Sequence, residues 1–97
     1  MPKRPKKSKY KSVVIKKKRY YYYKITWIDP TGDSGPATAQ DSLGLVPSTM
    51  ITHAYLFDKS KKYVWTFASY EEGDELFSDR NVFPKGWISK MEKISEK

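Results

Sequence analysis

Few side chains in this sequence are of the kinds that perform catalysis. The chain has a single histidine, His53, and no cysteine, which excludes cysteine nucleophiles, disulfides and thiolate zinc sites. His53 lies in the middle of a predicted strand, on the face that it shares with Ile51 and Tyr55. At such a position we expect a hydrogen-bonded histidine of the core or rim rather than a catalytic base.

Carboxylates are the remaining candidates for binding a metal ion. Asp29, Asp33 and Asp41 lie in one predicted loop, but they lack the Asp-x-Asp-x-Asp-Gly pattern of calcium loops. The sequence also lacks a glycine-rich phosphate loop and the GxSxG and HExxH motifs. We interpret these aspartates as solvated turn residues and predict neither a metal site nor a cofactor.

One short stretch is close to a catalytic motif. Residues 32–36 (GDSGP) are one glycine short of GDSGGP, the sequence around the serine nucleophile of chymotrypsin-like proteases. Those enzymes need two β-barrels, and their histidine and aspartate both precede the serine in the chain. Here His53 follows Ser34, and 97 residues are too few for two barrels. We interpret the stretch as a turn and predict that the protein is not an enzyme.

Positive charge is concentrated at the start of the chain. The protein has 19 lysines and arginines and 11 aspartates and glutamates. Residues 1–19 contain ten of the cations and no acid, so residues 20–97 carry nine cations and eleven acids. Proline, lysine and serine dominate the first segment, and its like charges repel one another. This composition predicts a flexible basic arm over residues 1–19 and a β domain over residues 20–97.

A flexible basic arm can follow a phosphate backbone without reading the base sequence. We therefore predict that the arm binds DNA or RNA through its ten cations, Lys3, Arg4, Lys6, Lys7, Lys9, Lys11, Lys16, Lys17, Lys18 and Arg19. A nuclear import signal, a clamp on an acidic protein and a purely solubilising tail are the alternatives.

The pattern of apolar and aromatic residues predicts an all-β fold. Residues 20–28 (YYYYKITWI) are almost all β-branched or aromatic, which is typical of strands. Alternation along this strand assigns four residues to the core face, namely Tyr21, Tyr23, Ile25 and Trp27. The same signals predict three further strands, at residues 48–57, 63–70 and 76–83.

Two segments have more than one interpretation. Residues 13–15 (VVI) fit either an added edge strand or an anchor for the arm. Residues 84–94 fit either a 3₁₀ or helical turn, or a turn followed by a short closing strand. Four or five antiparallel strands with one long early loop and a late break indicate a small SH3-like barrel that carries a disordered basic N-terminal arm. An OB-like barrel is the alternative.

The long connection at residues 29–47 is the candidate protein-binding loop, because a compact domain seldom contains so long an irregular segment without a use for it. We predict that it contacts a protein partner, together with the aromatic rim beside it, through Asp29, Asp33, Ser34 and Asp41. Several aromatic residues could stack on nucleic-acid bases, although filling the core is their expected role. These are Tyr20, Tyr22, Trp65, Tyr70 and Trp87.

Four short motifs carry a resemblance to known proteins. They are residues 26–29 (TWID), 32–34 (GDS), 52–56 (THAYL) and 80–88 (RNVFPKGWI), the last followed by Met91. With these motifs, over about residues 21–94, the body resembles small uncharacterised proteins of tailed bacteriophages, especially marine ones. The chain departs from that group at Gly35 and Pro36, where a tryptophan often stands, and in its basic arm. The resemblance implies an SH3-like barrel and a phage setting, and it transfers no site residue.

Together these features predict a non-enzymatic binding protein. Its arm holds nucleic acid while its slightly acidic body docks on a protein of the host or phage nucleic-acid machinery. The alternative is a minor virion protein whose barrel docks on the capsid or tail and whose arm contacts packaged DNA. Because no apolar run suits a membrane span or a signal peptide, we expect the protein in the host cytoplasm or the virion, neither secreted nor in a membrane. The oligomeric state stays open.

Overall fold

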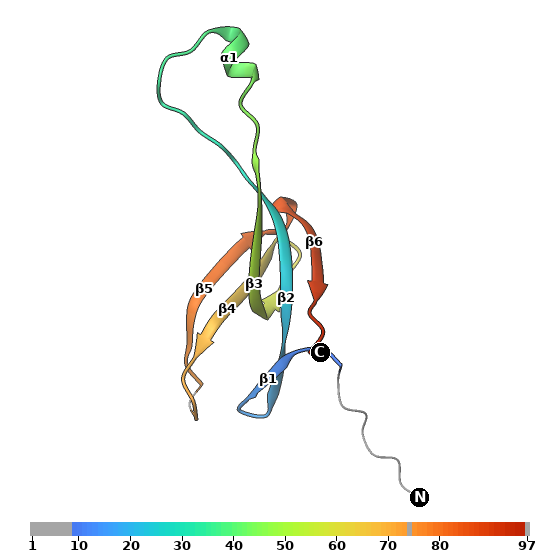
Figure 1. Cartoon of the computed structure of the whole chain (residues 1–97). Helices are drawn as coiled ribbons and strands as arrows, with labels where there is room; N and C mark the ends of the chain where they lie inside the picture. The colour runs from blue at the N-terminus through green and yellow to red at the C-terminus, as the bar shows by residue number, and fades with distance from the viewer. Residues whose placement is uncertain (1–8, 74, 97) are drawn as a thin grey trace, which may run out of the picture.

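The computed structural model describes residues 9–73 and 75–96 of the chain. These residues form six strands, one short helix and one 3₁₀ turn (Figure 1). In chain order the elements are β1 (Ser12–Ile15), β2 (Lys18–Asp29), α1 (Ala39–Leu43), β3 (Ser48–Lys59), β4 (Tyr63–Tyr70), β5 (Phe77–Pro84), η1 (Lys85–Trp87) and β6 (Ile88–Lys93). All neighbouring strands are antiparallel, so the predicted small all-β fold is confirmed.

Strand β2 organises the sheet. Its one edge pairs with β3, and its other edge is shared by β1, opposite residues 18–21, and β6, opposite residues 23–27. From β3 the sheet continues to β4 and then β5. A barrel closes only when its two end strands pair, and among the described residues no strand pairs with the outer edge of β5. The sheet is therefore open, where the sequence predicted a closed barrel.

The two ambiguous segments both form strands. Residues 13–15 belong to β1, the added edge strand. In residues 84–94 the 3₁₀ turn Lys85–Trp87 is followed by β6, which pairs with β2. The turn with a closing strand is thus the correct interpretation of the C-terminal segment.

One core consists of aromatic rings on the face that β1 covers. Phe67 is fully buried there, with its ring centroid 5.3 Å from those of Tyr20 and Tyr55 and 4.8 Å from that of Phe77. Ile15 of β1 packs into the same cluster. Edge-to-face and offset ring pairs contribute about 0.5–1.5 kcal/mol each beyond the area that they bury. A small number of large aromatic residues thus fills this core.

A second group of buried residues lies on the opposite face. Tyr22, Tyr55 and Phe67 are successive cross-strand partners and therefore share one face. Strand residues at odd spacings from these three point the other way. The buried apolar residues on that side are Ile25, Ala54, Val64 and Phe83, and Thr66 is buried there as well.

The predicted core face of β2 is correct only in part. Ile25 is fully buried, but Tyr21 and Tyr23 are half-buried, and Tyr20, which alternation assigned to the outer face, is only 4% exposed. The physical reason is β1, because its hairpin brings Ile15 onto the side of Tyr20. The start of β2 therefore has packing partners on both faces.

The flexible arm predicted over residues 1–19 is wrong for its second half. β1 and β2 form a hairpin whose two-residue turn consists of Lys16 and Lys17. Their φ angles of 49° and 69° are those of a type I′ turn, which matches the twist of the flanking strands. The domain therefore begins before residue 20.

The segment ahead of β1 is tied to the C-terminal end of the chain. The Lys11 N–H donates to the Ile94 carbonyl oxygen (2.8 Å), and the Glu96 N–H donates to the Lys9 carbonyl oxygen (2.9 Å). Figure 1 shows the beginning of the blue segment next to the C-terminus. Only residues 1–8 of the predicted arm lie outside the described residues.

Candidate nucleic-acid and protein interfaces

Four consecutive cations lie in the β1–β2 hairpin, two in its turn and two at the start of β2. Lys16, Lys17, Lys18 and Arg19 are all exposed, and we call them the basic hairpin. In the part of the chain that the structure describes, no ion pair neutralises these cations. The Arg19 guanidinium donates to the hydroxyl of Ser12, across the hairpin.

The basic hairpin contains four of the ten cations predicted to bind nucleic acid. Lys9 and Lys11 are also exposed and lie just ahead of β1. The other four, Lys3, Arg4, Lys6 and Lys7, lie outside the described residues. Folding thus places the described cations on a defined element and its flank instead of a free tether.

Tyrosine rings lie among these cations. The Nζ atom of Lys11 is 4.3 Å from the ring centroid of Tyr22. Lys93 of β6 places its Nζ atom 4.3 Å from the ring of Tyr21 and 5.3 Å from that of Tyr10. The sequence analysis assigned Tyr21 to the core and did not single out Lys93, because only the pairing of β6 with β2 brings the two residues together.

A groove of about 240 Å³ lies between the start of β2 and the end of β3, and we call it the tyrosine groove. Its lining includes Tyr21, Tyr23 and Leu56 and the cations Lys18, Arg19 and Lys59. The β2–β3 pairing sets Tyr23 opposite Ala54, and the register of β3 shifts between Leu56 and Asp58. Cations and half-exposed aromatic rings therefore meet in one hollow.

The β2–β3 loop, residues 30–47, projects away from the sheet and carries α1 near its tip (Figure 1). Every residue of this loop is exposed. Thr38 caps α1 by accepting a hydrogen bond on Oγ1 from the Asp41 N–H (3.0 Å). Asp33 accepts one on Oδ1 from the Gly35 N–H (2.9 Å). Asp33 thus shapes the loop through its carboxylate, whereas Asp41 contributes its backbone N–H to the helix cap.

The four residues predicted to bind protein lie along this projection. Asp29 ends β2 opposite Ser48 and is half-buried, while Asp33, Ser34 and Asp41 are exposed. Among the described residues, no hydrogen bond joins any two of these four. They mark one surface without forming a compact cluster.

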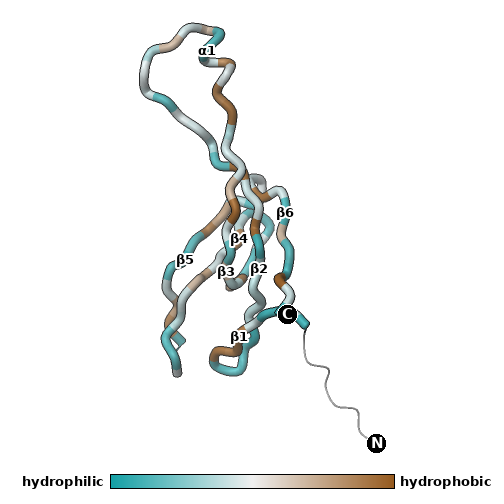
Figure 2. Tube along the Cα trace, in the orientation of Figure 1, coloured by the Kyte–Doolittle hydropathy of each residue, from teal (hydrophilic) through white to brown (hydrophobic). Residues whose placement is uncertain are grey.

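The apolar side chains of this loop were missed by the sequence analysis. Leu43 is 87% exposed, and Leu45 and Val46 are also exposed. Figure 2 shows this apolar stretch just after α1, beyond the sheet. The signal was present as LGLV at residues 43–46, a run that has no core to enter.

Aromatic side chains form a rim at the base of the loop. A hollow of about 310 Å³ there is lined by Trp27, Asp29, Phe83 and Trp87, among others. The Trp27 ring lies 5.2 Å from that of Phe83, and its Nε1–H donates to Thr52 Oγ1 (2.9 Å). Because Asp29 lines this hollow, the loop adjoins the aromatic rim.

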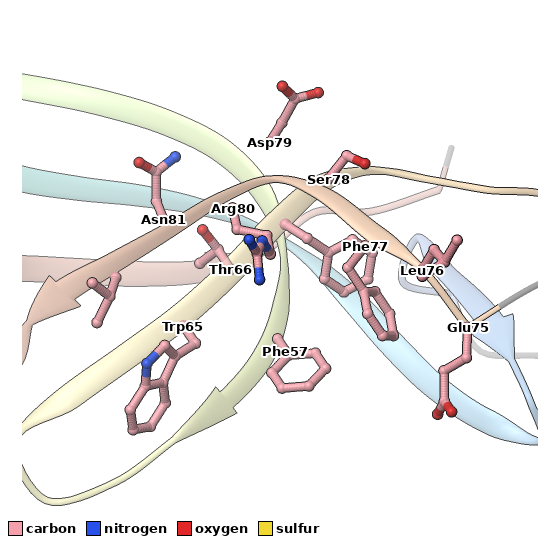
Figure 3. A pocket seen from close by; sticks show the side chains of 12 residues that line it. Phe57, Trp65, Thr66, Glu75, Leu76, Phe77, Ser78, Asp79, Arg80 and Asn81 are labelled. Atoms are coloured by element: carbon pink, nitrogen blue, oxygen red, sulfur yellow. The ribbon is translucent and has the colours of Figure 1, made fainter.

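A groove of about 790 Å³ runs over β4 and β5. Figure 3 shows the side chains of Trp65, Phe57, Phe77 and Arg80 on one side of the β5 ribbon and that of Asp79 on the other. Residues three apart point to opposite faces in a regular strand. The φ of 51° at Asp79 interrupts that alternation, so that Phe77 and Arg80 both reach the groove.

The aromatic residues considered for base stacking have different environments. Tyr20 is buried and Tyr22 half-buried in the aromatic core, whereas Trp65, Tyr70 and Trp87 are exposed. Burial raises the pKa of Tyr55, and the neighbouring Tyr70 and Tyr22 hydroxyls add to the rise. The Tyr55 side chain, 8% exposed, belongs to the aromatic core.

The polar residues singled out at first lie apart from one another. His53 is exposed, and its ring lies 6.5 Å from that of Tyr22 and nearly parallel to it. No group of three or more histidine, aspartate or glutamate side chains is close enough to hold a metal ion within residues 9–73 and 75–96. In the same residues, no helix is long and apolar enough to cross a membrane.

Comparison with known proteins gives no further guide. The chain matches no family model, no curated protein and no solved structure.

Proposed function

We propose that this protein binds nucleic acid without sequence specificity and docks on a protein partner, without acting as an enzyme. Nucleic-acid binding is inferred from the basic hairpin, Lys16 to Arg19. These four cations are exposed, and none of them forms an ion pair among the described residues. Four adjacent cations repel one another, and a bound anion offsets this unfavourable electrostatic energy. A phosphate backbone supplies closely spaced negative charges and releases counterions when it is bound.

The protein half of the proposal rests on the β2–β3 loop. It is exposed throughout, carries an apolar tip around Leu43 and adjoins the aromatic rim at Trp27 and Trp87. Its acids, Asp33 and Asp41, give it a different charge from that of the basic hairpin. The two surfaces thus have the chemistry for two partners.

We infer further that the sheet is a variant of the SH3-like type. The support is the order of elements: a long loop follows the first long strand, two hairpins come next, and a 3₁₀ turn precedes a last strand beside the first. The resemblance to small tailed-phage proteins supports a phage setting, with host or phage nucleic-acid machinery as the partner. A minor virion protein that contacts packaged DNA is the second candidate.

The test is a salt titration of binding to a labelled duplex by fluorescence anisotropy. Each cation that contacts a phosphate adds about 0.9 to the slope of log affinity against log salt concentration. The double substitution Lys16→Gln with Lys17→Gln should therefore reduce the slope by about 1 to 2. Deletion of residues 1–19 is a poor test, because it removes β1 and the start of β2.

The matched control removes the same charge elsewhere. Lys61 and Lys62 lie in the exposed β3–β4 connection, and their replacement by glutamine should leave the slope near the wild-type value. Equal slopes for the two double variants would show that binding follows total charge, and the assignment to the basic hairpin would be wrong.

A further inference from the structure

The tyrosine groove combines two kinds of surface that the basic hairpin alone does not have. Tyr21 and Tyr23 are half-buried, and both line the groove. They are two residues apart on β2, so their side chains point to the same face, about 7 Å apart. Two neighbouring aromatic rings in this arrangement offer a platform for flat ligands.

Cations surround these rings. Lys18, Arg19 and Lys59 line the groove, and the Nζ atom of Lys93 lies 4.3 Å from the ring of Tyr21. Asp58 is the acidic residue of the lining, and its Oδ1 atom accepts a hydrogen bond from the Lys59 N–H (2.8 Å). The charge around the groove therefore favours an anionic ligand.

The size of the groove narrows the choice of ligand. Its volume of about 240 Å³ is below the range of roughly 300–1,000 Å³ that is typical of pockets for drug-sized molecules. The groove is also continuous with the basic hairpin, because Lys18 and Arg19 belong to both. A short piece of a longer anionic polymer fits these features better than a free small molecule.

We propose that the tyrosine groove binds unpaired bases of single-stranded nucleic acid. The bases stack on Tyr21 and Tyr23, and the flanking phosphates contact Lys18, Arg19 and Lys59. Bases inside a duplex are stacked on one another and cannot offer their faces to the rings, whereas unpaired bases can. This inference rests on the proposed nucleic-acid binding and adds to it a preference for single strands.

The test compares a labelled twelve-nucleotide oligothymidylate with a duplex of the same length, at one salt concentration, using the full-length protein. Stacking contributes about 1–3 kcal/mol per base. We therefore expect Tyr21→Leu with Tyr23→Leu to weaken single-strand binding about tenfold or more and duplex binding less than twofold. Replacement of both tyrosines by phenylalanine keeps the rings and should preserve most of the single-strand affinity.

A control variant accounts for the loss of a surface tyrosine. Tyr63 is 44% exposed at the start of β4 and does not line the tyrosine groove, so Tyr63→Leu should leave single-strand affinity unchanged. If the leucine variants fail to fold, amide chemical shifts of the wild type titrated with oligothymidylate answer the same question. The largest shifts are expected at Tyr21, Tyr23 and Leu56.

Separate outcomes overturn the two proposals. If the wild type binds duplex and single strand equally and the leucine variants change nothing, the groove assignment fails while the nucleic-acid proposal stands. The same holds if the largest chemical-shift changes lie outside the groove. If the wild type binds neither probe at low salt, the proposed function fails and the inference fails with it.

Discussion

Thr66 is a buried residue whose polar atom is not satisfied. Its side chain is 2% exposed on β4, and its Oγ1 atom has no hydrogen-bond partner among the described residues. A buried hydroxyl without a partner costs about 1–3 kcal/mol. We expect Thr66→Val to raise the free energy of unfolding by about 1 kcal/mol, and the melting temperature by about 4–8 °C, as thermal denaturation can measure.

Thr52 provides the matched control, because the same substitution there is expected to change the free energy of unfolding in the opposite direction. Its Oγ1 atom accepts a hydrogen bond from the indole N–H of Trp27 (2.9 Å). Thr52→Val should lower the free energy of unfolding by about 1 kcal/mol, since the indole N–H loses its acceptor. If both variants shift the melting temperature in the same direction, hydrogen-bond satisfaction is not what distinguishes these sites.

At the scale of elements, the turn of the β1–β2 hairpin contains residues that are unfavourable for its backbone conformation. Lys16 and Lys17 both have positive φ, a conformation that costs a residue with a side chain roughly 1–2 kcal/mol. Asparagine and glycine are the residues that favour a type I′ turn. We expect Lys16→Asn with Lys17→Gly to raise the free energy of unfolding by about 1 kcal/mol, measured by urea denaturation.

The double glutamine variant of the same two residues separates backbone strain from charge. It removes both charges but keeps side chains at positive φ, so its gain in stability should be clearly smaller. An equal gain in the two variants would mean that repulsion between adjacent cations, and not the turn conformation, is the cost. A strained turn made of two lysines and followed directly by Lys18 and Arg19 fits an element kept for binding.

The same hairpin shows where prediction from sequence ends. Strands β2 to β5 follow from alternating apolar and aromatic residues, which is local information. Residues 9–19 are rich in lysine and have little alternation, so composition indicated an unfolded arm. Their structure comes from contacts across the whole chain, with β2 on one side and Ile94 and Glu96 on the other.

Prediction of the candidate sites from the sequence meets the same limit. Composition identified the cations, and the long loop after β2 was recognised from its turn residues. The tyrosine groove was not predicted, because its lining combines Tyr21 and Tyr23 with Lys59 from the far end of β3. That combination depends on the β2–β3 pairing and on the register shift after Leu56, which no local pattern reveals.

At the scale of the whole molecule, the two proposed surfaces lie at opposite ends. Figure 1 shows the β1–β2 hairpin at one end of the sheet and the loop with α1 at the other. The strands between them, β2 and β3, are each 12 residues long, or roughly 40 Å at 3.2–3.4 Å per residue. Substitutions far apart, with no shared partners, act independently, so changes at one end should not alter binding at the other.

This separation can be tested with variants of the loop tip. Leu43 is 87% exposed and Val46 68% exposed, so Leu43→Ser with Val46→Ser should leave the melting temperature and the salt slope for duplex binding unchanged. The same variant, immobilised, should lose the proteins that the wild type retains from a nuclease-treated cell extract, whereas Lys16→Gln with Lys17→Gln should retain them. Gln40→Ser, an exposed polar change in α1, serves as the control. If the serine variant retains the same proteins as the wild type, the loop is not the docking surface; if the glutamine variant loses them, the two ends do not act separately.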